Sequence, residues 1–375
     1  MPGSILARFQ RQGASNPDSE SSPAEKVRAA SKAYRRWGLV VLVTALFAAW
    51  LCYRWWGRGF QWEVFAASFT HLDWRWVAAS AGFGLLTYYG RALRWAVMLR
   101  PLQPRPNMWN LFTATAVGFT AIVLLGRPGE LVRPYLISVK ERVPFSSQLA
   151  AWFLERVCDL LAVLLVFGLS LSQVRTSRAN LSPGLEWVLQ AGGYLAGIIA
   201  AVCLLVLIVL RQFSDQMRRR LLEALGFLSS HHFQKVERIA TAFVEGIGAT
   251  KSHAAVLLLI FYTFLEWVLI ILCTLALLKA FPGTSAFRLE DVLIFVGFVS
   301  FGNVVQIPGV GGGIQVACVV VLRELFGVPL ELATGVAIML WFITFIVIVP
   351  IGLFLGVKEG FNWKKLRELR KEVDL

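Results

Sequence analysis

Four long apolar runs constrain this chain more than any other feature, because each is close to the length that crosses a lipid bilayer. A transmembrane helix needs about 20 predominantly apolar residues. The clearest runs are Gly38–Trp56, Val188–Leu210, Ala254–Leu278 and Gly335–Val357. The chain is 57% hydrophobic and only 16% charged, whereas a soluble domain is about a quarter charged. The sequence therefore predicts an all-α, polytopic membrane protein.

The formal net charge of +14 is explained by membrane orientation rather than by nucleic-acid binding. Lys and Arg lie in short blocks beside the apolar runs, at Arg28–Arg36, Arg211–Arg220 and Lys364–Lys371. The positive-inside rule places charge in this way, and anionic lipid headgroups are its natural partner. Since the chain has no basic domain with its own core, we expect no nucleic-acid partner.

The remaining composition predicts neither a metal site nor a nucleotide site. The cysteines are single and lie in apolar runs, which is typical of packing residues: Cys52, Cys158, Cys203, Cys273 and Cys318. His231-His232 has no other metal ligand nearby and is interpreted as part of a solvated loop. No Gly-x-x-x-x-Gly-Lys motif is present, so ATP is not an obvious energy source and we expect no cofactor.

Coarse helix boundaries follow from the apolar pattern. We predict helices at 38–56, 75–98, 108–125, 148–172, 187–210, 253–278, 289–306, 314–326 and 334–357. A short aromatic helix in the outer interface is predicted from Trp62, Phe65, Phe69, Leu72 and Trp76. Residues 1–37 are interpreted as a largely disordered cytoplasmic tail, 211–252 as a cytoplasmic loop with amphipathic helices, and 358–375 as a basic cytoplasmic tail.

The charge of these segments tests the number of crossings. The tail before residue 38, the loop 211–252 and the tail after 357 are all rich in Lys and Arg, so all three should be cytoplasmic. If each of the first five helices crossed the membrane, the loop 211–252 would lie outside. The simple count therefore fails by one crossing.

Two helical hairpins that enter and leave on the same side restore the count. The first is 108–139, broken at Gly126-Arg-Pro-Gly-Glu130, and the second is 289–326, broken at Gln306–Gly313. Two ordinary crossings at either place preserve the same parity, and this alternative stays open. The re-entrant reading is favoured because 130–139 and 314–326 are short for full spans.

The hairpins give the chain an inverted repeat. The first unit, 75–172, and the second, 253–357, each contain a helix, a hairpin and a helix, in opposite orientations. With residues 38–357 as the membrane domain, we expect about six full transmembrane helices plus two re-entrant hairpins. Paired Gly/Pro breaks in matching positions mark the substrate site of many transporters; here they are Pro128-Gly129 and Pro308-Gly309.

A half-helix starting at Pro128 would aim free N–H groups of Gly129, Glu130 and Leu131 into the protein, where they favour an anion such as phosphate. The glycines of the second hairpin could act in the same way: Gly309, Gly311, Gly312 and Gly313. The alternative is that these glycines only permit a tight turn and close helix packing.

Charged residues at membrane depth are the other candidates. Five are positive (Arg91, Arg94, Arg127, Arg133, Arg156) and four are negative (Glu130, Glu155, Asp159, Glu266). Because charges are costly in lipid, they must face the protein interior, and one surplus positive charge would suit a single phosphate. Two alternatives stay open: a closed ion-pair cluster that holds the hairpin, and, for Arg91 and Arg94, side chains that extend to the headgroups.

Three ordered motifs resemble the lysylphosphatidylglycerol synthase transmembrane, or flippase-like, family. They are Gly126-Arg-Pro-Gly-Glu130, Glu155-Arg-Val-Cys-Asp159 and Ile307-Pro-Gly-Val-Gly311, and the resemblance covers most of 38–357. It implies a membrane domain that moves aminoacylated phospholipids or other anionic lipid conjugates between leaflets. It also singles out Arg127, Glu130, Glu155, Arg156 and Asp159.

The chain departs from the family pattern at two positions. Gln315 stands where a Glu is typical after the second Pro-Gly, and Trp341 where the last span often has an Arg. Lipid-modifying members also attach a large soluble transferase domain, whereas only a short basic tail follows Val357, so we expect no lipid synthesis by this chain.

The leading hypothesis is an inner-membrane translocator of an anionic phospholipid or lipid-linked conjugate, not an enzyme, with both termini cytoplasmic and a homodimer possible. Two rivals are a membrane-embedded transferase with Glu155 or Asp159 as base, and a non-transporting assembly partner. The predicted substrate-binding residues are Arg127, Gly129, Glu130, Arg133, Glu155, Arg156, Asp159, Glu266, Pro308, Gly309, Gly311 and Gln315.

Overall fold

The structure is a computed structural model that describes residues 60–177, 183–212, 252–300, 302, 306–307 and 311–358. The chain divides into Met1–Phe60 and Gln61–Leu375, and the second unit is the one described below. The predicted helix 38–56, the amphipathic stripes and His231-His232 of the loop 211–252, and nearly all of the C-terminal tail lie outside the described residues. Within the described ranges the elements are helices, apart from a two-residue antiparallel ladder.

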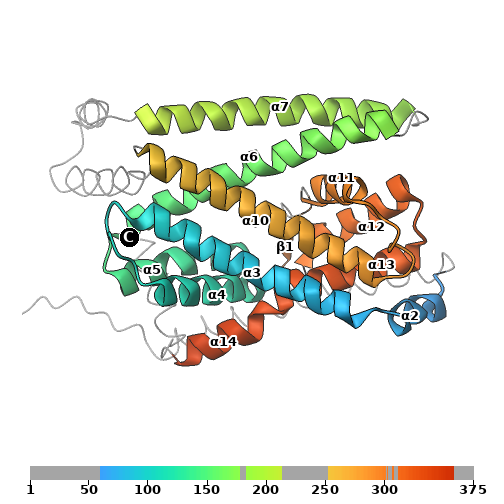
Figure 1. Cartoon of the computed structure of the whole chain (residues 1–375), viewed down its shortest axis with the longest axis horizontal. Helices are drawn as coiled ribbons and strands as arrows, with labels where there is room; N and C mark the ends of the chain where they lie inside the picture. The colour runs from blue at the N-terminus through green and yellow to red at the C-terminus, as the bar shows by residue number, and fades with distance from the viewer. Residues whose placement is uncertain are drawn as a thin grey trace, which may run out of the picture. The chain divides into compact units, whose positions relative to one another are not determined.

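Two long helices, α3 (Trp74–Leu99) and α10 (His253–Ala280), form the central pair (Figure 1). They run antiparallel, because the start of α3 meets the end of α10: Asp73 N donates to Ala280 O at 3.0 Å. About a quarter of the way along α3, Ser80 Oγ donates to Cys273 O at 2.7 Å. The predicted helices 75–98 and 253–278 are confirmed to within a few residues.

The segment Met108–Glu141 folds back on itself. It comprises α4 (Met108–Leu125), the 3₁₀ turn η1 (Arg127–Leu131) and α5 (Val132–Glu141). Gly126 ends α4 with φ of 71°, a conformation that favours glycine. The two ends of the segment are joined, since Glu141 accepts bonds from Asn107 N (3.3 Å) and Asn110 Nδ2 (2.8 Å). Met108–Glu141 is called the first hairpin below.

A second hairpin is formed by α11 (Leu289–Val299) and α12 (Gly313–Phe326), with β1 (Gln306–Ile307) and β2 (Gly311–Gly312) between them. The rings of Phe287 and Phe326 close its ends at 4.7 Å. The predicted helix 289–306 is wrong at its C-terminal end, because α11 stops at Val299. The backbone turns there: a Cβ on Gly302 would lie 2.5 Å from the Gly313 carbonyl oxygen.

The last span is not the single helix predicted for 334–357. It consists of α13 (Leu330–Trp341), a π-helical turn η4 (Phe342–Ile346) and α14 (Ile348–Lys358). Pro350 has no N–H for the carbonyl four residues earlier, at Ile346, which breaks the regular pattern. Val347 N instead donates to Phe342 O at 3.1 Å, across five residues.

The described part of the unit contains three further helices: α2 (Trp62–Thr70), α6 (Phe145–Ser177) and α7 (Pro183–Gln212). The predicted aromatic helix is shorter than expected. Trp76 belongs to α3, because the Asp73 side chain caps that helix by accepting from Arg75 N at 2.9 Å. Leu72 lies between the two helices and is buried.

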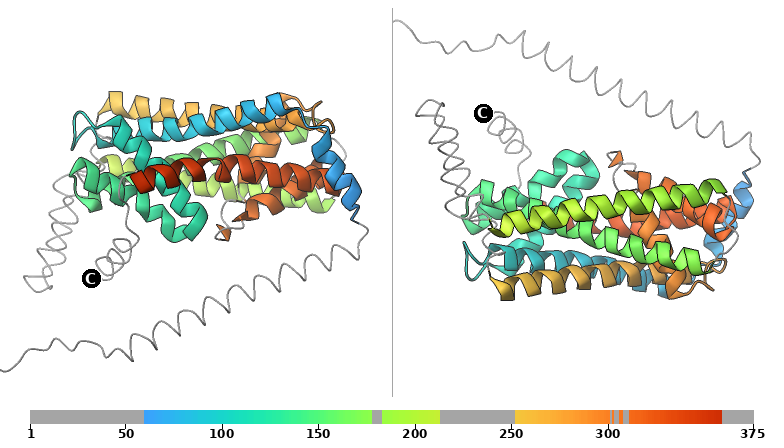
Figure 2. Two further views of the ribbon diagram at one scale, coloured as in Figure 1. Left: turned by 90° about the horizontal axis from the view of Figure 1, so that it is seen from below. Right: turned by 90° about the horizontal axis from the view of Figure 1, so that it is seen from above.

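The first helix of each hairpin packs against the last helix of the other half of the unit. α4 lies against α14 and α11 against α6. In both contacts a glycine permits the close approach: a Cβ on Gly352 would lie 2.0 Å from Thr120 Oγ1, and one on Gly297 would lie 2.3 Å from Ser170 Oγ. Figures 1 and 2 show α4 and α5 toward one end of the α3–α10 pair, and α11 and α12 toward the other.

The outer surface of the helices is apolar. On α10, Leu257, Ile260, Phe261 and Phe264 recur at helical spacing and are 55% to 67% exposed. Soluble proteins rarely expose continuous apolar surface of this kind. Within the described residues, three segments are long and apolar enough to cross a membrane: Met108–Leu125, His253–Ala280 and Leu330–Lys358.

Candidate functional site

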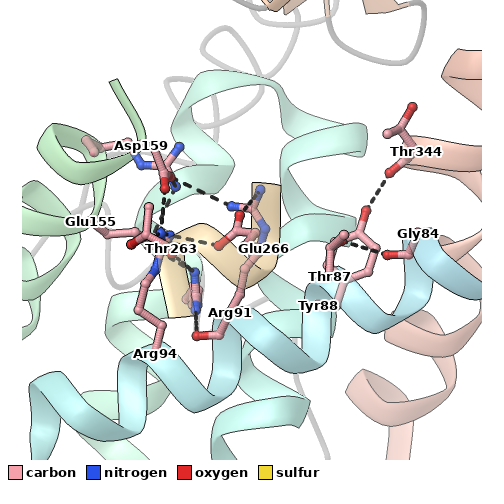
Figure 3. A network of polar contacts seen from close by, with 12 residues as sticks. Gly84, Thr87, Tyr88, Arg91, Arg94, Glu155, Asp159, Thr263, Glu266 and Thr344 are labelled. Carbon is pink, nitrogen blue, oxygen red and sulfur yellow. Dashed lines mark hydrogen bonds and ion pairs between the residues drawn. The ribbon is translucent and has the colours of Figure 1, made fainter. Parts of the chain in front are cut away.

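Arg94 lies at the centre of a buried cluster of charges (Figure 3). Its side chain is only 1% exposed. Nη1 donates to Asp159 Oδ1 at 2.6 Å, and Nη2 donates to Glu155 Oε1 at 2.7 Å. Nη1 also lies 3.3 Å from both Glu266 Oε2 and Thr263 Oγ1. Three helices, α3, α6 and α10, therefore meet at one guanidinium, and Arg94 does not extend to the headgroups.

Arg133 connects the first hairpin to the same cluster. Its Nη1 donates to both oxygens of Glu155, at 3.0 and 3.1 Å, and its Nη2 donates to Arg91 O at 3.0 Å. The guanidinium lies 4.1 Å from the ring centroid of Trp95. Gly118 on α4 allows this position, because a Cβ there would lie 2.6 Å from Arg133 Cβ. These contacts fix α5 against α3 and α6.

A second layer of charges surrounds this core. Arg91 Nη2 lies 2.6 Å from Glu266 Oε1, and its Nη1 lies 4.0 Å from Asp159 Oδ2. Arg156 Nη2 lies 3.2 Å from Asp159 Oδ2 and 3.5 Å from Glu155 Oε2. The Arg156 side chain is 40% exposed, in contrast to Arg94 and Arg133.

The tip of the first hairpin contributes one more ion pair. Arg127 Nη1 donates to Glu130 Oε1 at 3.1 Å, and the Arg127 side chain is 56% exposed. All nine charges predicted from the sequence thus lie in or beside one cluster, five positive and four negative. Pairing is the physical reason, since an isolated charge costs several kcal/mol in lipid.

The outer layer faces a cavity of about 400 Å³ between the helices. Helices from both halves of the unit line this cavity, as do η1, η4 and the start of α12. Its charged lining residues are Arg91, Arg127, Arg156, Asp159 and Glu266. Its hydroxyl-bearing lining residues are Thr87, Tyr88, Thr274, Ser300 and Thr344.

The charged residues lie at one end of the cavity, and the lining becomes mainly apolar, with several hydroxyl groups, toward the other. Along α6 the lining passes from Arg156 and Asp159 to Leu160 and Val163. Along α10 it passes from Glu266 to Trp267, Ile270, Cys273 and Thr274. The other apolar lining residues are Phe119, Phe295, Val296, Val299, Ile314, Leu340 and Phe345. This arrangement can surround a small polar group beside an apolar one.

The glycine predictions have a different outcome from the charge predictions. The N–H of Gly129 is not free for an anion, because it donates to Gly126 O at 2.9 Å within η1. A Cβ on Gly129 would lie 2.4 Å from the backbone of Ala121, so this glycine permits close packing. Gly311 pairs with Ile307 in the short ladder. Pro308 and Gly309 lie outside the described residues.

Gln315 caps the second half of its hairpin. Its Oε1 accepts from Gly312 N at 2.7 Å, at the start of α12. This bond stabilises the start of α12, and Gln315 is not among the residues that line the cavity.

Sequence reasoning missed Tyr88, Thr263 and Thr344, and it left the role of Arg91 and Arg94 open. The Tyr88 hydroxyl donates to Thr344 O at 2.5 Å, across the cavity wall. The i, i+3 spacing of Arg91 and Arg94 was a usable signal, since it matches the i, i+4 spacing of Glu155 and Asp159 on a facing helix. No comparable signal identifies a backbone carbonyl such as that of Thr344.

In the part of the chain that the structure describes, no group of three His, Cys, Asp or Glu side chains is placed to hold a metal ion. Cys158, Cys203, Cys273 and Cys318 are free thiols.

The apolar surface and the membrane-length helices around a buried ionic core define an integral membrane protein. The family model for the lysylphosphatidylglycerol synthase TM region matches residues 35–352. The chain belongs to this family, as its three sequence motifs predicted. Neither a curated protein nor a solved structure matches it.

Proposed function

We propose that the protein is a lipid translocator of the bacterial inner membrane, which moves an anionic lipid or lipid-linked conjugate between leaflets without an ATPase or enzymatic activity of its own. The observation that carries this proposal is the cavity, which has its charged residues at one end and a mainly apolar lining at the other. A lipid headgroup with the glycerol or prenyl group attached to it also has a charged part beside an apolar part. The volume of about 400 Å³ suits a headgroup, while the tails stay in the bilayer.

The proposed architecture is an inverted repeat with two re-entrant hairpins. The pairing of α4 with α14 mirrors the pairing of α11 with α6. The first helices of the two repeats, α3 and α10, pack against each other. α5, with 10 residues, is about 15 Å long, and α11, with 11, is about 17 Å. Both are short for a hydrocarbon core of about 30 Å. Broken backbone at that depth needs protein or a wet cavity around it.

The proposed orientation follows from charge. Arg105, Lys140 and Arg142 lie at the open end of the first hairpin, and the positive-inside rule places that end in the cytoplasm. The second hairpin, at the opposite end of α3 and α10, then enters from the periplasm. Both termini are cytoplasmic in this arrangement.

In the proposed mechanism the headgroup phosphate contacts Arg91, Arg127 or Arg156 at the charged end of the cavity. Asp159 and Glu266 hold Arg91 and Arg156 in place when the site is empty, and Glu130 holds Arg127. Rocking of one repeat against the other opens the cavity to each leaflet in turn, as in other transporters built from inverted repeats.

Leaflet exchange in reconstituted vesicles tests the proposal. Purified protein is placed in vesicles that contain a fluorescent phosphatidylglycerol, and the label accessible to a membrane-impermeant quencher is followed over time. We expect exchange by the natural protein and slower exchange by Arg127→Ala and Asp159→Asn, which alter the cavity wall. Arg323→Ala is the matched control, because Arg323 lies on α12 away from the cavity and is 55% exposed. Exchange no faster than in protein-free vesicles would refute the proposal.

A further inference from the structure

The five charged side chains of the cavity wall are not balanced. Three are arginines (Arg91, Arg127, Arg156) and two are acidic (Asp159, Glu266). Because the wall carries a surplus of one positive charge, the empty site favours a net negative ligand. The ion pairs within the wall determine which other charged or polar groups the ligand can have.

Both carboxylates of the wall are ion-paired with arginines, and the two buried Glu266 oxygens make these ion pairs without a hydrogen bond among the described residues. Glu266 is 1% exposed, with Oε1 at 2.6 Å from Arg91 Nη2 and Oε2 at 3.3 Å from Arg94 Nη1. Asp159 has Oδ1 at 2.6 Å from Arg94 Nη1 and Oδ2 at 3.2 Å from Arg156 Nη2. Each oxygen of each acid thus faces a guanidinium. An incoming ammonium group would have to displace an arginine or lie beside one, and both are unfavourable.

Arg156, in contrast, retains hydrogen-bond donors. A guanidinium has five N–H donors. Arg156 forms its two ion pairs through Nη2 alone, so Nη1 keeps N–H donors for a ligand. Its side chain is 40% exposed at the cavity. An anionic oxygen is the acceptor that such a donor lacks.

The hydroxyl groups of the wall donate their hydrogen bonds to backbone carbonyls. Thr87 donates to Gly84 O (2.6 Å), Thr274 to Ile270 O (2.9 Å) and Ser300 to Val296 O (2.7 Å). The lone pairs of these hydroxyl oxygens remain as neutral acceptors, to which a hydroxyl of the ligand can donate. They add no negative charge that would attract an amine.

We propose that the cavity selects a phosphodiester headgroup whose other polar atoms are hydroxyls, and discriminates against a headgroup that carries an amine. This inference rests on the proposed function and narrows its substrate. It separates the chain from the cationic, lysylated lipid in the family's name. Phosphatidylglycerol, with one phosphate and two free hydroxyls, has the selected chemistry.

Two measurements on the full-length protein test the selectivity. The first is leaflet exchange with fluorescent phosphatidylglycerol, phosphatidylethanolamine or lysylphosphatidylglycerol at equal mole fraction. The second is native mass spectrometry, which counts how much of each lipid stays bound. We expect phosphatidylglycerol to be preferred over its lysyl ester about tenfold, since one unfavourable charge contact in a partly hydrated site has that size.

Arg156→Gln removes the surplus charge and should reduce the preference to about twofold or less. Arg323→Gln makes the same chemical change away from the cavity and should leave the preference unchanged. Arg127→Gln is a second cavity variant, chosen because Arg127 lines the cavity and is 56% exposed.

The outcomes separate this inference from the proposed function. Equal or stronger binding and exchange of the lysyl ester would overturn the selectivity, even if the protein moves lipids. Selective retention of phosphatidylglycerol without any exchange would support the selectivity and overturn the translocator. A preference that Arg156→Gln and Arg323→Gln reduce equally would show that the cavity arginine does not set it.

Discussion

Glu155 is the side chain on which the charge cluster most depends. It is fully buried, accepts two bonds from Arg133 and one from Arg94, and lies 3.5 Å from Arg156. Three cations from three helices share this carboxylate. A buried cluster of ion pairs does not by itself show that the protein is more stable. Removing one member, however, leaves the other buried charges without a partner. The inner cluster therefore acts as the joint that holds the first hairpin.

We predict that Glu155→Gln destabilises the protein by about 3–5 kcal/mol, the usual loss when one partner of a buried ion pair is removed. Thermal unfolding in detergent, followed by circular dichroism, measures the effect. Glu324→Gln is the control, because Glu324 is 64% exposed and its ion pair with Arg323 is long, at 3.9 Å from Oε1 to Nε; it should change stability by less than about 0.5 kcal/mol. Equal melting curves for the two variants would contradict a joint at Glu155.

The charged half of this site was within reach of the sequence, and the reason is physical. A carboxylate or guanidinium at membrane depth must find a partner, so the charges predicted to face inward do meet. Which arginine is buried and which faces the cavity depends on side-chain packing. Gly118 places Arg133 beneath Trp95, and no periodicity in the sequence contains that information.

At the scale of elements, the breaks in the helices carry the unexpected features. The Pro-Gly break of the first hairpin was predicted, but not the 3₁₀ turn that occupies the Gly129 N–H. Pro350 could have predicted the break in the last span, but the continuous apolar run around it favoured a single helix. There the π-helical turn Phe342–Ile346 places Thr344 on the cavity wall, and π-helical turns often lie at functional sites.

The bond from the Tyr88 hydroxyl to Thr344 O ties this turn to α3. We predict that Tyr88→Phe weakens the tie by about 0.5–1.5 kcal/mol, the net value of a hydrogen bond. Backbone amides of residues 342–348 should then exchange with deuterium several-fold faster, because local opening becomes easier. Hydrogen–deuterium exchange with mass spectrometry gives the rates.

Tyr89→Phe provides the matched comparison for this prediction. Tyr89 is the next residue of α3, is 47% exposed and does not line the cavity. Its substitution should leave exchange at 342–348 unchanged. The same exchange rates in both variants would mean that the Tyr88 bond does not control the turn.

At the scale of the whole molecule, the two halves are related through their contacts rather than their sequences. Each hairpin packs on the last helix of the other half, through a glycine in each case. Charge parity and helix lengths predicted the hairpins because both are properties of segments. The exchange of partners between halves is tertiary, so the sequence pattern alone did not specify it.

Membrane depth is the property that separates re-entrant hairpins from ordinary pairs of crossings, since both give the same parity. Single cysteines in a background without the five natural ones report it at Arg105, Arg127 and Glu324. Arg105 and Glu324 are exposed at opposite ends of the α3–α10 pair.

A bulky, impermeant maleimide should label Arg105→Cys only from the cytoplasm and Glu324→Cys only from the periplasm. Arg127→Cys should resist it from both sides and react only with a small reagent, because the proposed re-entrant arrangement puts the hairpin tip within the bilayer. Labelling of Arg127→Cys from the periplasm by the bulky reagent would instead identify Met108–Leu125 as a full crossing. A protein that retains only the buried Cys318 gives the background.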